Sequence, residues 1–461
     1  MFRQVSTSRP VETGRDEHEG RSAYPRSRGG RRAGGRMADL QAPRGMSDVL
    51  PEDEPLWRFV RDTAERVARS FDYRLINTPI VEDVRVFSRT VGDESDIVSK
   101  EMYVFEDRGG GELALRPEGT AAVCRAYLEH GMGSRPQPVR LYYFGPMFRY
   151  DRPQAGRYRQ LWQFGVECIG DPSPAADAEI IELQYTLFRE LGLDDLTLSI
   201  NSIGTAETRR TYVDVLREHL RPHLEGLSHD SQRRFETNVL RILDSKEDAE
   251  HPALRSAPSI LDYLTDEDAE HFAEVRGLLD ASGVAYEVAP RIVRGLDYYA
   301  RTVWEFEPPA EGSDGGQQGT VSAGGRYDGL MELLGGPATP GTGTAMGVER
   351  TVLNLRARGI EAPSDAPVDV VTIPLGERGP AAALRLAQSL RAAGLTVRAG
   401  IPGRSLRAQL RSAGAAGARY AAILGDDEAA RGVVQLKHLA GDGEQREVAV
   451  GDAADVVAGG G

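Results

Sequence analysis

Cysteine and long apolar runs are what this sequence most conspicuously lacks. The 461 residues contain two cysteines, Cys124 and Cys168, which excludes a disulfide framework and favours a reducing compartment. No apolar run is long enough to cross a bilayer, so we expect no membrane partner and a cytoplasmic location. Globular composition at this length predicts two or three domains with ample core.

The familiar nucleotide and metal motifs are also missing. The sequence has no P-loop, no dinucleotide-binding G-x-G-x-x-G, no H-E-x-x-H and no C-x-x-C. His219 and His223 are four residues apart, but Pro222 between them disfavours a helical metal pair, so we expect no protein metal site. A nucleotide site must therefore be built from arginines and a sheet surface.

A net charge of −14 argues against a protein that coats nucleic acid without sequence preference. It leaves open a nucleic-acid partner bound by a local basic patch, because such patches set binding whereas net charge mainly affects solubility and steering.

The stretch 139–170 predicts an antiparallel hairpin with a long loop. Aromatic and β-branched residues form two runs around Pro153 and Gly156. Period-two alternation places Gln163 and Glu167 on one face of the returning strand, a polar face that is costly to bury unless something polar binds there. The loop carries four guanidinium groups, which suit a polyanion but also fit a solvated hairpin tip: Arg149, Arg152, Arg157 and Arg159.

The rest of the chain predicts an α/β protein in several parts. Residues 1–36 are rich in Arg, Gly and Ser, so we expect a disordered extension that is mis-assigned or dispensable, with Met37 as the natural start. Strand and helix patterns over 37–203 include a second hairpin, formed by the runs 102–105 and 113–115, and a helix after Pro55. The apolar stripe of that helix is predicted at Leu56, Phe59, Val60, Ala64, Val67 and Phe71. Such patterns resume at 291–358, with a Gly/Gln loop at 312–319 and a Gly/Thr/Pro loop at 335–344. Residues 204–290 read as a helical insertion. A linker at 359–367 precedes a small α/β domain at 368–461.

Single residues outside the hairpin leave alternatives open. Glu118 and Thr120 begin a helix, where capping is the simpler explanation. The tyrosines at 298, 299 and 327 fit an aromatic core when taken singly. Gly324-Gly325 beside Arg326-Tyr327 indicates close approach of the backbone to something else.

Taken together, these segments resemble the histidyl-tRNA synthetases, a family of class II aminoacyl-tRNA synthetases, from about Ala42 to the end. The resemblance rests on segments in family order: RPEGTA at 116–121, FRYDRPQAGRYRQLWQFGVE at 148–167, RGLDYYARTVWEF at 294–306, AGGRYDGL at 323–330 and AMGVER at 345–350. The hairpin resembles motif 2 and AMGVER resembles motif 3. Thr344 departs from the bulky residue usual before AMG.

The resemblance implies a class II antiparallel sheet flanked by helices, and a ligase that uses ATP, substrate-bound Mg²⁺, L-histidine and tRNA(His). It implies that Arg149 and Arg294 are catalytic, and that Arg149, Arg157, Tyr158 and Arg350 bind ATP. It assigns histidine binding to Glu118, Thr120, Gln163, Glu167, Arg294, Tyr298, Tyr299 and Tyr327. In this scheme Glu167 and Tyr299 bind the imidazole nitrogens, and the substrate pairs the otherwise unpaired Gln163 and Glu167. A site of this kind rejects apolar side chains without an editing domain.

The resemblance also implies an anticodon-binding role for the C-terminal domain. Arg404, Arg407 and Arg411 recur at helical spacing and are predicted to contact the tRNA backbone. A homodimer is expected, with residues 42–54 and the first long helix near the interface. The alternative is a binding protein with the same fold, the synthetase-like regulatory subunit of ATP phosphoribosyltransferase.

Overall fold

The computed structural model describes residues 40–91, 101–151, 156–245, 247–293, 298–309, 319–363, 368–439 and 443–459. The expectations for residues 1–36, for Arg152 and Arg294, and for nearly all of the 312–319 loop lie outside them. The chain divides into two compact units, Met1–Ala362 and Pro363–Gly461. The finer domain boundaries stay predictions.

A large sheet is the centre of the first unit. Its strand order is β1-β5-β6-β11-β10-β9-β7-β8, with antiparallel pairing throughout the interior and parallel pairing at the edges, β1 with β5 and β7 with β8. This arrangement confirms the antiparallel sheet expected from the sequence. The strands are β1 (Arg74–Leu75), β5 (Val139–Phe148), β6 (Gln160–Ile169), β7 (Thr197–Ser202), β8 (Glu287–Val288), β9 (Ala300–Glu307), β10 (Ser322–Arg326) and β11 (Gly341–Gly347).

β5 and β6 form an antiparallel hairpin, as predicted, and they lie in the interior of this sheet. Tyr143 pairs with Gly165, and Leu141 pairs with Glu167. The alternation of strand residues sends Tyr142, Phe164 and Val166 into one core. Gln163 and Glu167 therefore belong to the opposite face.

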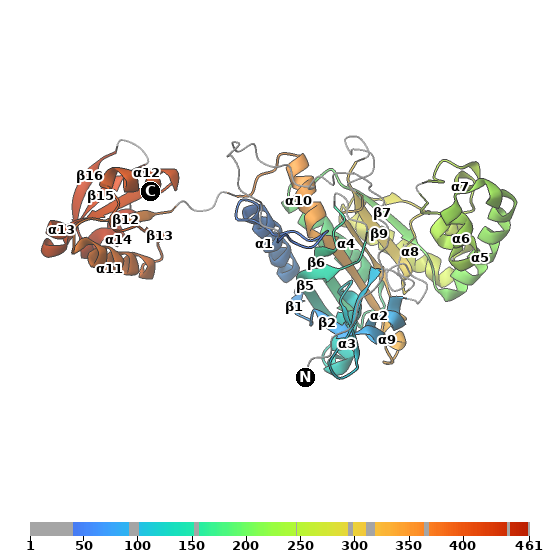
Figure 1. Ribbon diagram of the computed structural model, residues 1–461. Coiled ribbons are helices and arrows are strands. Elements are labelled where there is room, and N and C mark those ends of the chain that lie inside the picture. The colour runs from blue at the N-terminus through green and yellow to red at the C-terminus, as the bar shows by residue number, and fades with distance from the viewer. Residues whose placement is uncertain are drawn as a thin grey trace, which may run out of the picture. The chain divides into compact units, whose positions relative to one another are not determined.

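Four helices cover the first face (Figure 1): α1 (Glu54–Ser70), α4 (Pro174–Glu190), α8 (Asp266–Ala281) and α10 (Val348–Ala357). Their apolar sides meet the strands in one core, to which the helices contribute Val60, Ile180, Val275 and Val352. The stripe predicted for α1 is correct, since Leu56, Val60, Ala64 and Val67 are all buried.

The other face carries α3 (Thr120–Glu129) and a small three-stranded sheet. This sheet has the order β2-β4-β3 and contains the second predicted hairpin. Its strands and the nearby short helices are β2 (Val81–Asp83), α2 (Val84–Val91), β3 (Tyr103–Glu106), β4 (Glu112–Leu115), η2 (Met132–Ser134) and α9 (Leu330–Leu333).

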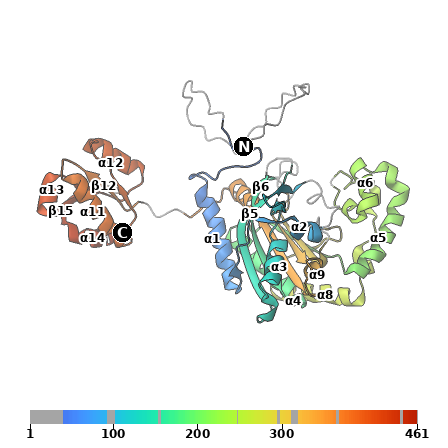
Figure 2. The same cartoon turned by 60° about the horizontal axis from the view of Figure 1, so that its bottom comes forward.

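The stretch 204–290 is mostly helical, as predicted. Its first helices form a group beside the sheet in both Figure 1 and Figure 2: α5 (Ala206–Leu220), η3 (Arg221–Gly226), α6 (His229–Thr237), η4 (Val239–Ile242), α7 (Pro252–Arg255) and η5 (Ile260–Tyr263). The last helix, α8, instead packs on α4 within the core of the sheet. Helical periodicity reveals that a helix has an apolar side, but not which neighbour covers that side.

The loop expected over 335–344 is wrong for its last residues. Gly341, Gly343 and the threonines between and after them belong to β11, paired on both sides with β6 and β10. Glycine is uncommon in strands, and here it allows bulky side chains of neighbouring segments to lie against the strand.

The second unit is the small α/β domain expected. Its sheet has the order β13-β12-β14-β15-β16, with β12, β13 and β14 parallel and the remaining pairs antiparallel. The antiparallel edge was not foreseen. The elements are β12 (Val370–Pro374), α11 (Gly379–Ala392), β13 (Val397–Ala399), α12 (Leu406–Ala415), β14 (Tyr420–Leu424), α13 (Asp426–Arg431), β15 (Val433–His438), β16 (Gln445–Ala449), η6 (Val450–Asp452) and α14 (Ala453–Ala458).

Candidate active site

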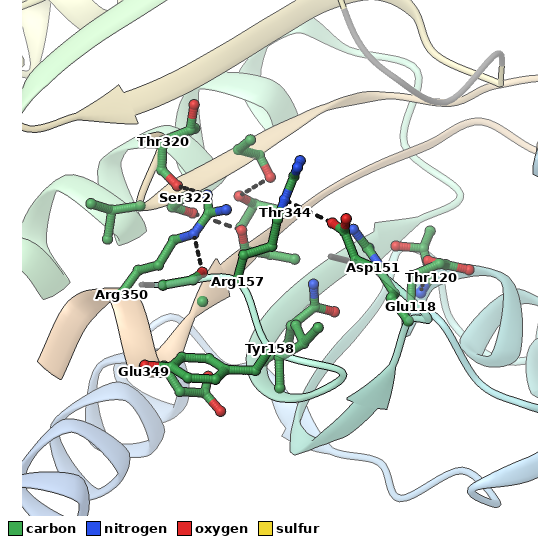
Figure 3. Close-up of a pocket in the computed structure, with 18 of the residues that line it drawn as sticks. Glu118, Thr120, Asp151, Arg157, Tyr158, Thr320, Ser322, Thr344, Glu349 and Arg350 are labelled. Carbon is green, nitrogen blue, oxygen red and sulfur yellow. Dashed lines mark hydrogen bonds and ion pairs between the residues drawn. The ribbon is translucent and has the colours of Figure 1, made fainter. Parts of the chain in front are cut away.

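A cavity of about 320 Å³ lies over the polar face of the hairpin. It is bounded by β5, β6, β10 and β11 together with the N-terminal ends of α3 and α10 (Figure 3). The sequence-predicted residues in its wall are Glu118, Thr120, Arg149, Arg157, Tyr158, Gln163, Tyr298, Tyr299 and Arg350. The structure thus brings together residues more than 200 positions apart in the chain.

Three arginines define one end of the cavity. Arg149 Nε donates to the carbonyl oxygen of Pro117 at 2.8 Å. Arg350 donates from Nε to the Gly156 carbonyl at 3.0 Å and from Nη1 to the Thr320 carbonyl at 2.6 Å. These bonds hold the guanidinium groups in place without neutralising their charge.

The third arginine, Arg157, is paired with Asp151 at 2.7 Å and is half exposed (Figure 3). Burial is the largest cause that lowers the pKa of Arg350, and the positive charges of Arg157 and Arg149 lower it further. Guanidinium groups that repel one another in a partly dry site favour an anion with several charges, such as a polyphosphate.

Glu118 marks the acid end, where α3 begins; Arg149 donates to the carbonyl of the preceding residue, Pro117, so the acid end adjoins the arginine end. Its carboxylate accepts the backbone N–H groups of Thr120 at 2.6 Å and Ala121 at 2.9 Å, so the capping interpretation is correct. Burial raises the pKa of Glu118, and the two backbone N–H groups act in the opposite direction. The carboxylate also lines the cavity, so capping and ligand binding are compatible.

Glu167 was assigned to the histidine site, but it lies behind the residues that line the cavity and has no exposed surface. The Thr120 hydroxyl donates to Oε1 at 2.7 Å, and the Tyr327 hydroxyl donates to Oε2 at 2.6 Å. The expectation that only a bound substrate could pair this acid was therefore wrong, because two hydroxyl groups of the protein do so. Burial nevertheless raises the pKa of Glu167 to about 8, since desolvation outweighs the two hydrogen bonds.

Two glycines of β11 make room for this arrangement. A Cβ atom at Gly343 would lie 1.9 Å from Glu167 Oε2, and one at Gly341 would lie 2.3 Å from the Tyr327 ring. The Gly/Thr composition that resembled a loop is the sequence signal of these close approaches.

The aromatic residues divide between the wall of the cavity and the layer behind it. Tyr298 and Tyr299 line the cavity, with ring centroids 4.7 Å apart. Tyr327 was expected to wall the pocket, but it lies behind the wall, where its side chain is 1% exposed and bonded to Glu167. Thr344, the departure from the family pattern, lines the cavity and donates to the Ala323 carbonyl at 3.1 Å.

Tyr143 and Glu349 are among the cavity residues that the sequence interpretation missed. Tyr143 of β5 lies in the wall, although its aromatic run indicated only a strand. Glu349 accepts the Trp162 backbone N–H with both oxygens, at 2.9 and 3.0 Å, and burial raises its pKa to about 7. Because Glu349 directly precedes Arg350 in the sequence, its place near the cavity could have been predicted from that position.

The three arginines predicted to contact tRNA belong to the second unit. Arg404 lies just before α12, and Arg407 and Arg411 lie on it; all three are exposed. The structure of this unit is thus compatible with a basic surface on that helix.

Comparison with known proteins supports the same interpretation. The model of the histidyl-tRNA synthetase family matches residues 45–351, and the model of an anticodon-binding domain matches residues 369–459. The chain belongs to the histidyl-tRNA synthetase family.

Individual members of this family match over nearly their whole length. Histidine–tRNA ligase from Anoxybacillus flavithermus is 47% identical over 412 residues, covering 89% of this chain and 97% of that protein. The enzyme of the same name from Geobacillus thermodenitrificans is 46% identical over 416 residues, covering 90% and 97%. The crystal structure of apo histidyl-tRNA synthetase from S. aureus superposes with a TM-score of 0.76 at 35% identity and covers 91% of this chain and 99% of that one.

Two further observations bear on partners. Among the helices that the structure describes, none has the length and apolar character needed to cross a membrane. Within the same residues, no group of three or more His, Cys, Asp or Glu side chains is arranged to hold a metal ion.

Proposed function

We propose that this chain is a histidine–tRNA ligase, which joins L-histidine to tRNA(His) in two steps. In the first, a carboxylate oxygen of histidine attacks the α-phosphorus of ATP, forming histidyl-adenylate and releasing pyrophosphate. In the second, a ribose hydroxyl at the tRNA 3′ end attacks the histidyl carbonyl, loses its proton and displaces AMP. The observation that carries the proposal is a cavity lined by three arginines and the buried Glu118 carboxylate, with the buried Glu167 carboxyl bonded to the lining residue Thr120, in a chain of this family.

The arginine end fits the triphosphate. In this scheme Arg149 binds the α-phosphate and stabilises the charge that develops there in the transition state. Arg350 binds the far end of the nucleotide near the γ-phosphate, with Arg157 and Tyr158 alongside. ATP enters as its Mg²⁺ complex, in which phosphate oxygens and water supply most of the ligands. Arg294, which lies outside the described residues, is assigned by the family resemblance to the space between the histidine carboxylate and the α-phosphate.

The acid end fits the amino acid. Glu118 and Gln163 face the cavity and suit the α-amino end of histidine. For the imidazole we infer Tyr299 on one nitrogen and Glu167 on the other. A carboxyl group whose pKa is about 8 can donate a proton to a neutral imidazole or receive one from an imidazolium, and this versatility suits the one side chain that titrates near neutrality.

Histidine-dependent exchange of labelled pyrophosphate into ATP tests the first step, and histidyl transfer to tRNA tests the second. Purified full-length chain should perform both, with no exchange for phenylalanine or glutamine. Histidine binding without exchange would instead favour the regulatory-subunit alternative. The anticodon-binding domain matched at residues 369–459 argues against that alternative, because we expect such subunits to lack the domain.

For the C-terminal unit we propose contact with the tRNA backbone through Arg404, Arg407 and Arg411. Replacement of all three by alanine should raise the KM for tRNA several-fold and reduce its salt dependence, because each guanidinium lost removes a phosphate contact. Pyrophosphate exchange without tRNA should be unchanged. A loss of exchange equal to the loss of transfer would contradict this assignment.

We also propose a homodimer. Val49 and Leu50 are exposed in the segment expected near the interface. Further large apolar side chains are exposed beyond that segment: Leu75, Ile80, Val81, Val104 and Phe105. Light scattering at micromolar concentration should give twice the chain mass of 50.2 kDa. A monomer at every concentration would contradict the proposal.

A further inference from the structure

The hydroxyl group of Tyr143 is a polar group of the cavity to which the preceding scheme gives no role. Tyr143 lies on β5 opposite Gly165, on the face of the hairpin that carries Gln163. Its side chain is 5% exposed, yet its hydroxyl oxygen is buried without a hydrogen-bond partner in the described structure. A buried hydroxyl without a partner is destabilising, so its retention needs a reason.

Two glycines hold the Tyr143 ring in this position. A Cβ atom at Gly165 would lie 2.1 Å from the ring carbon Cζ, and one at Gly119 would lie 2.2 Å from the same atom. The tip of the ring therefore occupies space that side chains at both positions would fill. Because β6 and the start of α3 confine the ring from two sides, the hydroxyl group has a defined position beside the acid end of the cavity.

The side chains near this hydroxyl group form no hydrogen bond with it in the described structure. Burial raises the pKa of Tyr143 well above its ordinary value, and the Glu167 and Glu118 carboxylates raise it further. The nearby Thr120 hydroxyl acts in the opposite direction on that pKa, but its single proton is given to Glu167 at 2.7 Å. Tyr143 therefore stays a neutral phenol whose oxygen can accept a hydrogen bond.

A second acceptor without a partner lies on the same face. Gln163 Oε1 is also buried and lacks a hydrogen bond in the described structure, and Gln163 lines the cavity. The Glu118 carboxylate is the third acceptor in this wall. Two unpaired acceptors beside a carboxylate match an ammonium group, which has three N–H donors and no acceptor.

We propose that Tyr143 is a specificity-determining residue whose hydroxyl oxygen accepts a hydrogen bond from the α-ammonium group of histidine. Gln163 Oε1 and Glu118 accept the other two N–H groups. Thr120 then acts indirectly, by donating to Glu167, rather than as a direct ligand of the amino group. This inference rests on the proposed function, since it specifies how the same cavity recognises its amino acid.

The test compares two ligands and two variants of the full-length chain by calorimetry. The ligands are L-histidine and 3-(imidazol-4-yl)propanoate, which lacks only the α-amino group. Tyr143→Phe removes the hydroxyl and keeps the ring. We expect it to weaken histidine binding about 10-fold, the equivalent of one hydrogen bond to a charged group, and to change the affinity for the deaminated ligand less than twofold.

Tyr142→Phe is the matched control. Tyr142 is the adjacent residue on β5, and its buried hydroxyl belongs to the core on the opposite face, where it interacts with Arg69 of α1. This variant should bind both ligands as the wild type does. Tyr143→Phe should not lower the unfolding midpoint, because it removes a hydroxyl that has no hydrogen bond in the described structure.

The outcomes separate the two levels of the proposal. Equal losses for both ligands in Tyr143→Phe, or no loss for histidine, would overturn the role of Tyr143 and leave the ligase proposal intact. Failure of the wild-type chain to bind histidine at all would instead contradict the proposed function. A selective loss for histidine alone would establish the contact with the amino group.

Discussion

The two ends of the cavity differ in the hydrogen-bond partners of their charged groups. At the acid end, the Glu118 carboxylate accepts two backbone N–H groups and the Glu167 carboxyl accepts two hydroxyl groups. At the arginine end, Arg149 and Arg350 donate to backbone carbonyl groups, which orient them, and carboxylates act on their charge without a hydrogen bond: Glu118 on Arg149, and Glu305 and Glu349 on Arg350. The two carboxyl groups therefore have hydrogen-bond donors of the protein before any ligand arrives, whereas the guanidinium groups of Arg149 and Arg350 stay available to an anion.

This difference teaches how one cavity accommodates two chemically different substrates. The amino acid is small and must be distinguished from similar molecules, so its end is rigid, dry and lined with fixed hydrogen-bonding groups. The triphosphate is highly charged, so its end gains affinity from convergent cations, and burial followed by their mutual repulsion lowers the pKa of Arg350. Substitutions at the two ends should consequently have different signatures.

The largest expected effect is at the arginine end. Arg149→Ala should lower the kcat of pyrophosphate exchange by about 10²–10³-fold, because it removes a preorganised cation from the reacting phosphate. Steady-state kinetics of pyrophosphate exchange measure this loss of kcat. Arg140→Ala is the control, since Arg140 lies on β5, the strand that Arg149 directly follows, but pairs with Glu179 at 3.0 Å. Comparable losses in the two variants would show a general effect on the hairpin.

At the acid end, Glu167→Gln should weaken histidine binding by about 10- to 100-fold and leave ATP binding within about threefold. The amide cannot exchange a proton with the imidazole, and it presents an NH₂ group where Thr120 and Tyr327 both donate. Calorimetric titration with each substrate separates the effects. Equal losses for histidine and ATP would count against an imidazole contact.

A pH dependence of stability should distinguish the ends further. The pKa of Glu167 is about 8 in the folded chain, above the ordinary carboxyl value of 4.5. The folded state therefore binds the extra proton between these values, and stability is lost as pH rises through about 8. Without ligands, the unfolding midpoint of the wild type should fall more between pH 6 and 9 than that of Glu167→Gln. Glu349, whose pKa is raised to about 7, has the same sign but is present in both proteins. Parallel curves would show that Glu167 is ionised throughout.

The smallest effect is expected for Arg157→Ala. Arg157 is half exposed and paired with Asp151, so much of its charge is already screened or compensated. The KM for ATP should rise only a few-fold, with kcat nearly unchanged. A loss as large as that of Arg149→Ala would mean that Arg157 contacts the reacting phosphate directly.

The sequence was sufficient for much of the fold. The alternation of β5 and β6 and the stripe of α1 were predicted correctly, because period-two and helical spacing follow directly from backbone geometry. The partner of α8 and the start of β11 were not, because burial of an apolar side and strand formation by glycines depend on which segments lie alongside. Most predicted cavity residues were found in its wall, while Tyr143 was missed because a strand tyrosine ordinarily indicates core packing.

By itself, the sequence determined which chemical groups are available and on which face of its strand each one lies. It determined that Glu167 occupies a polar face, that arginines surround the hairpin, and that glycines precede motif 3. Only the tertiary structure decided which residues donate hydrogen bonds to Glu167: Thr120 is 47 residues away and Tyr327 is 160 residues away. Local periodicity cannot encode contacts at such separations, because they arise only when the sheet has formed and the glycines of β11 leave room for the buried carboxyl group.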